Sequence, residues 1–153
     1  MTIVKGRFTL DTNVLVYAVD RDGGERHRRS MELVGRAAER DCVLMLQALA
    51  EFYHATTRKN LLGASDAGSL VRDWLEVFEI ASADREALAD AMSVVDEHRL
   101  SFWDAMLWAT ARQAGCSAIV SEDMQHGRRL GGVEFVNPFS PQAVATMATL
   151  LDA

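Results

Sequence analysis

Short apolar runs alternate with longer amphipathic segments along this chain. Runs this short are typical of buried strands. They predict strands at about residues 7–12, 43–46, 77–80, 118–120 and 134–136. Between them, apolar residues recur at helical spacing, and capping residues, glycine or proline mark the helix ends. Helices are therefore expected from residue 13 and at about 26–40, 47–59, 65–75, 84–98 and 101–114, with a last helix from residue 141.

The alternation of strands and helices predicts the fold class. Strands joined by helices form a mainly parallel sheet, here of about five strands, with helices on both faces. In such α/β folds, ligands bind in the crevice beyond the carboxyl ends of the strands. Polar residues that directly follow a strand are therefore the first candidates for function.

Four acidic residues are predicted to share that crevice. Asp11 follows the first strand, Asp123 follows the fourth, and Glu51 lies one helical turn past the second. Asp104 lies in the first turn of the helix predicted from Ser101. Like charges a few ångströms apart resist joint ionisation, so a gathered set of carboxylates favours a hard cation. Ligands that are all oxygen atoms indicate Mg²⁺ or Mn²⁺.

Two of these acids have explanations that need no metal. Asp11 suits a helix N-cap, although a cap accounts for one polar residue and here Thr12 and Asn13 follow it. We interpret Thr12 as local structure and Asn13 as a side chain that holds a carboxylate or a water. Glu51 falls on the polar side of its helix, where a solvated glutamate is ordinary.

The other two acids also have structural explanations. Asp104 comes three residues after Ser101, which matches a helix capping box. Its apolar neighbours are expected in the core, with Asp104 at the edge of that face: Phe102, Trp103, Met106 and Leu107. Asp123 has an acidic neighbour, Glu122, and adjacent side chains of an extended segment point to opposite sides. We favour Asp123 because it shares a side with Ser121, whose hydroxyl could orient a water or a ligand.

Composition and charge limit the partners. The chain has 153 residues, 49% of them apolar, and a formal net charge of −6. This size suits one globular domain, and the acidic balance argues mildly against tight nonspecific binding of nucleic acid. The arginines between residues 26 and 40 fit a solvated, ion-paired helix face. The better candidates for phosphate contact lie near the predicted crevice: Arg58, Lys59, Arg128 and Arg129.

Several other signatures are missing from the sequence. Cys42 and Cys116 lack CxxC spacing, the histidines lack zinc-ligand spacing, and there is no glycine-rich nucleotide motif. No apolar run approaches the length of a membrane span, and the N-terminus has no secretory apolar region. We therefore expect reduced cysteines and a cytoplasmic protein that stays out of the membrane.

Four motifs, each containing one of the four acids, are found at residues 8–15, 47–53, 100–105 and 119–127. In this order and at these separations they resemble the PIN-domain proteins, specifically the VapC-type ribonuclease toxins of bacterial toxin–antitoxin pairs. The resemblance covers nearly all of the chain and implies one PIN domain over residues 1–153. It also implies a three-layer α/β/α sandwich around the parallel sheet.

The resemblance further implies a function. It predicts RNA phosphodiester cleavage with Mg²⁺ or Mn²⁺ held by Asp11, Glu51, Asp104 and Asp123, with Ser121 at a supporting position. Family members typically form homodimers and are inhibited by a cognate antitoxin protein. The candidate dimer contacts Leu61, Leu62 and Leu70 are equally well explained by core burial.

Two alternatives stay open. One is a catalytically silent PIN module that only binds a partner protein. The other is a haloacid-dehalogenase-like phosphatase in which Asp11 would be the nucleophile. The phosphatase requires a second aspartate close to the first, and Asp11-Thr12-Asn13 lacks it.

Overall fold

Six short strands form the centre of the computed structural model, which describes residues 6–152. The strands are β1 (Phe8–Leu10), β2 (Val43–Met45), β3 (Glu79–Ala81), β4 (Ala118–Val120), β5 (Arg129–Leu130) and β6 (Val133–Val136). One sheet has the order β1-β4-β6-β5, and a second pairs β2 with β3. A parallel bridge between Phe8 and Cys42 joins them. All pairings are parallel except that of β5 with β6, which confirms the mainly parallel sheet.

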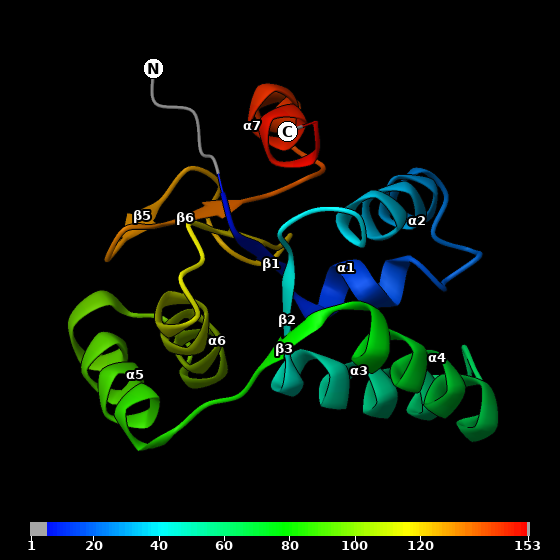
Figure 1. Cartoon of the computed structure of the whole chain (residues 1–153), viewed down its shortest axis with the longest axis horizontal. Coiled ribbons are helices and arrows are strands. Elements are labelled where there is room, and N and C mark those ends of the chain that lie inside the picture. The colour runs from blue at the N-terminus through cyan, green and yellow to red at the C-terminus, as the bar shows by residue number, and fades with distance from the viewer. Residues whose placement is uncertain (1–5, 153) are drawn as a thin grey trace.

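The helices cover the sheet from two sides. They are α1 (Thr12–Tyr17), α2 (Glu25–Ala37), α3 (Leu46–Arg58), α4 (Ala64–Val77), α5 (Arg85–His98), α6 (Phe102–Gln113) and α7 (Val144–Leu151). Figure 1 shows α5 and α6 on one side of the strands and α1 to α4 on the other. The fold is therefore the α/β/α arrangement that was expected from the alternation of elements.

Local sequence explains most of the helix boundaries. Asp84 and Ser101 cap α5 and α6 through their side chains, as the capping pattern predicted. Ser65 does not cap α4, which begins one residue earlier after Gly63. The last helix begins as a 3-10 turn at residues 141–143 before α7.

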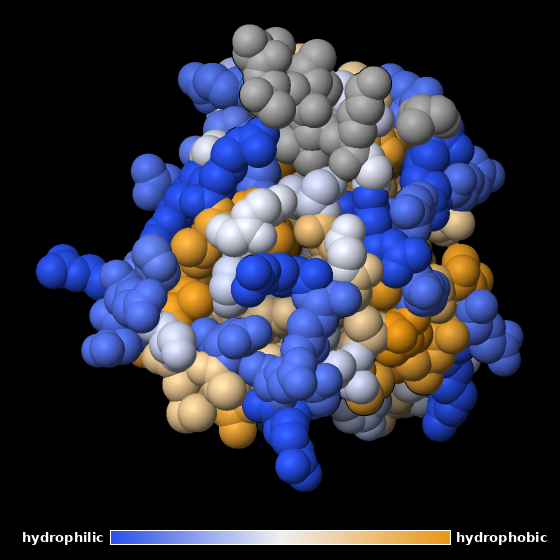
Figure 2. Space-filling view, turned by 60° about the vertical axis from the view of Figure 1, so that its left-hand side comes forward, coloured by the Kyte–Doolittle hydropathy of each residue, from blue (hydrophilic) through white to orange (hydrophobic). Residues whose placement is uncertain are grey.

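The core lies where the sheet meets the helices on both faces. Phe8, Leu10, Leu44, Ile119 and Phe135 have no exposed surface. A parallel sheet that is covered on both faces needs strands that are apolar throughout, and β1, β2 and β4 are buried at every position. The outer surface in Figure 2 is mostly hydrophilic, with separate hydrophobic patches.

Two residues that we predicted in the core lie on the surface. Phe102 is 37% exposed and Trp103 is 61% exposed. Both residues belong to the first turn of α6, before the part of the helix that packs into the core. Burial on α6 therefore begins at Ala105 and continues through Leu107 and Trp108.

The parallel strands end at one edge of the sheet, here called the carboxyl edge. Leu10 and Val120 are paired at the ends of β1 and β4, and the Asp11 N–H donates to the Val120 carbonyl oxygen at 2.9 Å. The chain turns into α1 after β1 and into α3 after β2. The segments that carry Asp11 and Ser121 are therefore neighbours, although 110 positions separate them along the chain.

Within residues 6–152, no helix combines the length and hydropathy that a membrane span requires. The prediction about a secretory segment falls partly on residues 1–5, which lie outside the described residues.

Candidate active site

Four carboxylates at the carboxyl edge influence one another, and we call Asp11, Glu51, Asp104 and Asp123 the acid cluster. Burial is the main cause that raises the pKa of Asp11 to about 6, and repulsion from Asp104 and Glu51 adds to it. The pKa of Asp104 is also raised, first by burial and then by Asp123 and Glu51. The tertiary structure thus brings together all four acids that the sequence placed in the crevice.

Asp11 is the most enclosed member of the acid cluster, with 8% of its surface exposed. One oxygen accepts from the Thr12 N–H at 2.7 Å, so Asp11 also caps α1. The other oxygen accepts from the Ser121 hydroxyl at 2.8 Å. These two hydrogen bonds lower the pKa of Asp11, but the opposing effect of burial is larger.

Asn13 and Ser121 connect the two strand ends. The Asn13 side-chain nitrogen donates to the Ser121 hydroxyl and to an Asp123 oxygen, both at 3.1 Å. The Asn13 side-chain oxygen accepts from the Glu122 N–H at 3.2 Å. Ser121 is fully buried and also accepts from the Asp123 N–H at 3.2 Å. The loop after β4 is therefore held in place against α1.

Glu51 is held by two residues to which the sequence assigned no function. The Thr12 hydroxyl donates to one Glu51 oxygen at 3.1 Å, and the Gln47 amide donates to the other at 2.9 Å. The same Gln47 nitrogen donates to the Trp103 carbonyl oxygen at 3.2 Å, which links α3 to α6. The spacing of Gln47 and Glu51, four residues apart on one helix, was the available signal.

Glu122 faces away from the acid cluster. Its carboxylate accepts from the Tyr17 hydroxyl at 2.7 Å and forms an ion pair with Arg26. The Arg26 guanidinium also lies 5.3 Å from the ring centre of Phe139. Of the two adjacent acids, Asp123 is the one that joins the cluster, as side-chain alternation predicted.

The four basic candidates occupy different places. Lys59 lines a groove that also contains Thr12, Asn13, Glu51 and Asp123, and the exposed Arg58 precedes it at the end of α3. The groove therefore places Lys59 beside the acid cluster.

Arg128 and Arg129 both have partners within the protein. Arg128 donates to the His98 carbonyl oxygen at 2.9 Å, and Arg129 forms an ion pair with Glu134 at 3.6 Å. Glu134 is level with Ala118, the first residue of β4. The structure therefore does not bring Arg129 to the carboxyl edge.

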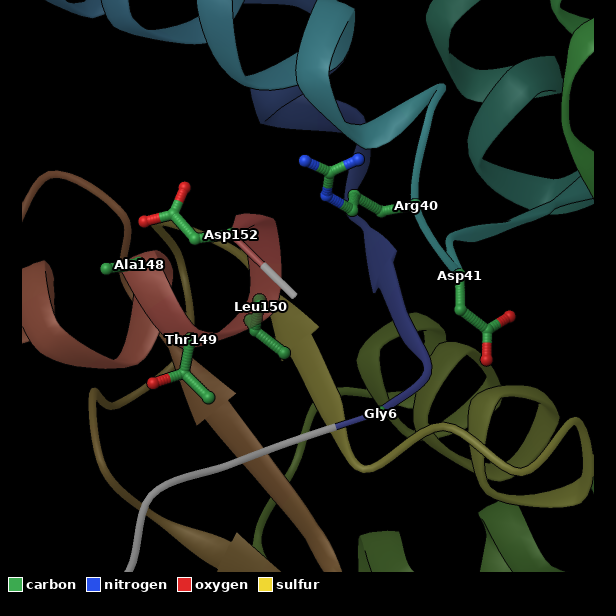
Figure 3. Close-up of a pocket in the computed structure, with 7 residues that line it drawn as sticks. All are labelled: Gly6, Arg40, Asp41, Ala148, Thr149, Leu150 and Asp152. Carbon is green, nitrogen blue, oxygen red and sulfur yellow. The ribbon is translucent and has the colours of Figure 1, made fainter.

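A separate pocket lies at the opposite edge of the sheet, where the strands begin. Figure 3 shows Thr149 and Asp152 from the C-terminal segment on one side of it and Arg40 and Asp41 on the other. Gly6, just before β1, also lines it. Because β1 separates this pocket from the carboxyl edge, it is not part of the acid cluster.

The chemistry of the acid cluster suits a hard divalent cation. Within residues 6–152, no three histidine, cysteine, aspartate or glutamate side chains are already arranged as a metal site. The donors that converge are nevertheless all oxygen. The buried Asp11 carboxylate has acidic neighbours, so a cation would offset the negative charge that gathers there. Oxygen ligands of this kind fit Mg²⁺ or Mn²⁺ better than zinc.

Comparisons with known proteins agree with this geometry. The sequence matches the PIN domain over residues 8–129. The chain belongs to the PIN domain family. No curated protein matches it in sequence.

Solved structures similar to this one include VapC toxins. VapC20 of Mycobacterium tuberculosis, a toxin that cleaves the sarcin-ricin loop, is 20% identical with a TM-score of 0.59, over 73% of this chain and 86% of that one. A DNA-bound VapBC from Salmonella typhimurium is 16% identical with a TM-score of 0.63, over 84% and 96%. FitAcB from Neisseria gonorrhoeae is 21% identical with a TM-score of 0.57, over 86% and 98%. At these identities the likeness shows a shared fold.

Replacing Ser121 with alanine tests its role in this PIN site. Ser121→Ala removes the hydrogen bond that lowers the pKa of Asp11 and leaves Asn13 with one acceptor fewer. We expect the pKa of Asp11 to rise further and the free energy of unfolding to fall by about 1–3 kcal/mol. Urea denaturation at several pH values measures both effects. The matched control is Ser65→Ala, at an exposed position in the first turn of α4. An equal response of the two variants would contradict the role of Ser121.

Proposed function

We propose that this PIN-domain protein is a metal-dependent endoribonuclease of the VapC toxin type. The observation that carries the proposal is the acid cluster, in which a buried aspartate and three further carboxylates meet beyond the ends of parallel strands. A chain gains nothing in stability from gathering like charges. A function that requires a cation accounts for their position.

The residues have distinct proposed roles. Asp11 and Asp123 would hold the principal cation, and Glu51 and Asp104 would complete its surroundings directly or through water. A divalent cation bound there would polarise the scissile phosphate and lower the pKa of water. Ser121 and Asn13 orient the two aspartates through the hydrogen bonds described above.

Thr12 and Gln47 have a parallel role at Glu51. Their hydrogen bonds reach both of its oxygens, so this exposed side chain keeps one orientation.

Hydrolysis forms a bond between a water oxygen and phosphorus and breaks one phosphodiester bond. Lys59, in the adjoining groove, is placed to attract the phosphates of the RNA on one side of the cluster.

The partners follow from the same proposal. Similar structures include a toxin–antitoxin complex from Klebsiella pneumoniae, 18% identical with a TM-score of 0.61, which supports a cognate antitoxin here. We propose a homodimer that acts in the cytoplasm, where RNA is available and the free thiols Cys42 and Cys116 stay reduced. Leu62 and Leu70 pack partly against the core, so their part in a dimer stays a proposal.

Cleavage of purified RNA tests this function. The protein is incubated with total RNA or with single-stranded DNA, in Mn²⁺, in Mg²⁺ or in EDTA. We expect cleavage of RNA that requires the metal. Intact RNA despite metal binding would favour the silent PIN module instead. The match to the PIN family argues against the phosphatase hypothesis. Release of phosphate from a phosphomonoester would support that hypothesis again.

A further inference from the structure

Two exposed aromatic side chains border the acid cluster. Trp103 is 61% exposed and Phe102 is 37% exposed. Their ring centres lie 4.9 Å apart, with 71° between the ring planes. They are the two residues before Asp104 at the start of α6. One helical turn therefore carries both aromatic rings and a member of the acid cluster.

Trp103 differs from the other two tryptophans. Trp74 is 8% exposed and packs against Phe52 with ring centres 4.8 Å apart. Trp108 is 3% exposed, and its indole N–H donates to the Leu130 carbonyl oxygen at 3.0 Å. Within residues 6–152, the indole N–H of Trp103 has no hydrogen-bond partner. Tryptophan is normally largely buried, so folding does not explain this side chain.

Gln47 fixes the position of Trp103 relative to the acid cluster. It donates to both the Trp103 carbonyl oxygen and Glu51. Glu51, Ala55 and Lys59, the C-cap of α3, line one groove, and Gln47 lies one helical turn before Glu51. Gln47 and Lys59 are about 18 Å apart along the helix axis. Trp103 therefore lies beside the Gln47 end of this stretch and Lys59 is at its other end, with Glu51 between them.

On the basis of the nuclease function proposed above, we propose that Trp103, supported by Phe102, stacks on an unpaired nucleobase of the RNA beside the scissile phosphate. Base–aromatic stacking is a common way to bind single strands, because every base presents an aromatic face. A base inside a duplex is already stacked on both sides and cannot use the ring. Trp103 is therefore a specificity-determining residue that selects an unpaired nucleotide.

The surroundings of the rings favour RNA over a protein partner. A stable protein interface buries about 800 Å² on each partner and excludes charge from its centre. Trp103 instead directly precedes Asp104, and its carbonyl oxygen accepts from Gln47, which also donates to Glu51. A divalent cation held by the acid cluster would attract the phosphates of a nucleic acid, so the ring and the cation site would serve the same ligand.

Tryptophan fluorescence tests the proposal directly, because Trp103 is the one strongly exposed tryptophan of the three. The Asp11→Asn full-length protein, which we expect not to cleave, is titrated with a short single-stranded oligouridylate and with the same strand in a duplex. We expect quenching by the single strand. Trp103→Phe should abolish the quenching and keep most of the affinity, whereas Trp103→Ala should weaken binding by roughly 10–100-fold.

Cleavage kinetics and a matched control complete the test. In the active protein, Trp103→Ala should raise KM for the single strand more than it lowers kcat. Met92→Ala removes a similarly exposed apolar side chain from α5 and should change neither value. Affinity within about twofold of the parent in Trp103→Ala, or equal loss in Trp103→Phe, overturns the stacking role.

Two further outcomes separate this inference from the function on which it rests. If the protein fails to cleave RNA but shows quenching that depends on Trp103, the nuclease proposal fails and the base contact stands. If the protein cleaves RNA and Trp103→Ala changes only its oligomeric state in light scattering, the rings form a protein interface and the stacking proposal is wrong.

Discussion

Asp11→Asn is expected to reduce RNA cleavage by roughly 1,000-fold or more, while the protein stays folded. The substitution keeps the size of the side chain and its ability to accept from Thr12 or Ser121. It removes the negative charge at the most buried position of the acid cluster. Cleavage is measured on RNA in Mn²⁺, with the fold checked by circular dichroism.

The same substitution should stabilise the metal-free protein at neutral pH. The pKa of Asp11 is raised from 3.8 to about 6 by burial, so between these values the folded state binds more protons than the unfolded state. Stability therefore falls as the pH rises through this window. Above pH 6 the buried charge costs up to about 3 kcal/mol. In EDTA, Asp11→Asn should lose less stability than the parent between pH 4 and pH 7, as measured by urea denaturation.

The matched control is Glu122→Gln. Glu122 is acidic and adjacent to Asp123, but it contacts Tyr17 and Arg26 instead of the acid cluster. We expect its cleavage rate to stay within about threefold of the parent, because surface ion pairs contribute little. Parent-level cleavage by Asp11→Asn, or equal losses in both variants, would reject the metal mechanism.

Divalent metal should stabilise the fold by an amount that depends on Asp11. A cation that binds only the native state adds about 2.7 kcal/mol at one hundred times its dissociation constant. For a protein of this size, this corresponds to a rise in Tm of roughly 5–10 °C. The physical reason is that the cation neutralises carboxylates that otherwise raise one another's pKa. Scanning calorimetry across a Mn²⁺ titration in a chelator-treated sample measures the rise.

Variants distinguish this site from adventitious binding. Asp11→Asn should remove most of the Tm shift, whereas Asp22→Asn, an exposed acid in the loop before α2, should keep it. A Tm that does not change with Mn²⁺ in the parent protein would count against the cation site. A shift that is equally large in Asp11→Asn would place the metal elsewhere on the surface.

Local patterns were sufficient for most of the fold. The apolar runs at residues 43–46 and 118–120 correspond to β2 and β4, because a strand between two helical layers must be apolar at every position. Ser101 and Asp84 marked helix starts, because capping is a contact between residues three apart. The two-residue strand β5 was missed, because its pairing with β6 forms across a turn and leaves no apolar run.

The sequence predicted some residues of the candidate site more directly than others. Asp11 and Asp123 follow buried strands, so parallel topology alone indicated their common edge. Glu51 resembled a surface residue, because its partner Thr12 belongs to another segment and its partner Gln47 reaches α6 only in the folded protein. Arg129 was a plausible phosphate contact by chain position, yet it pairs with Glu134 toward the other end of β6.

The sequence by itself determined the alternation of strands and helices, the parallel sheet, and the residue types that can hold a hard cation. These properties depend on periodicity and composition, which are local. Only the tertiary structure decided which polar groups touch: Gln47 links Glu51 to α6, and Glu122 pairs with Arg26 instead of joining the acid cluster. It also decided that Trp103 is exposed. Such contacts depend on where helices end relative to short strands, and that geometry arises only when all the layers pack together.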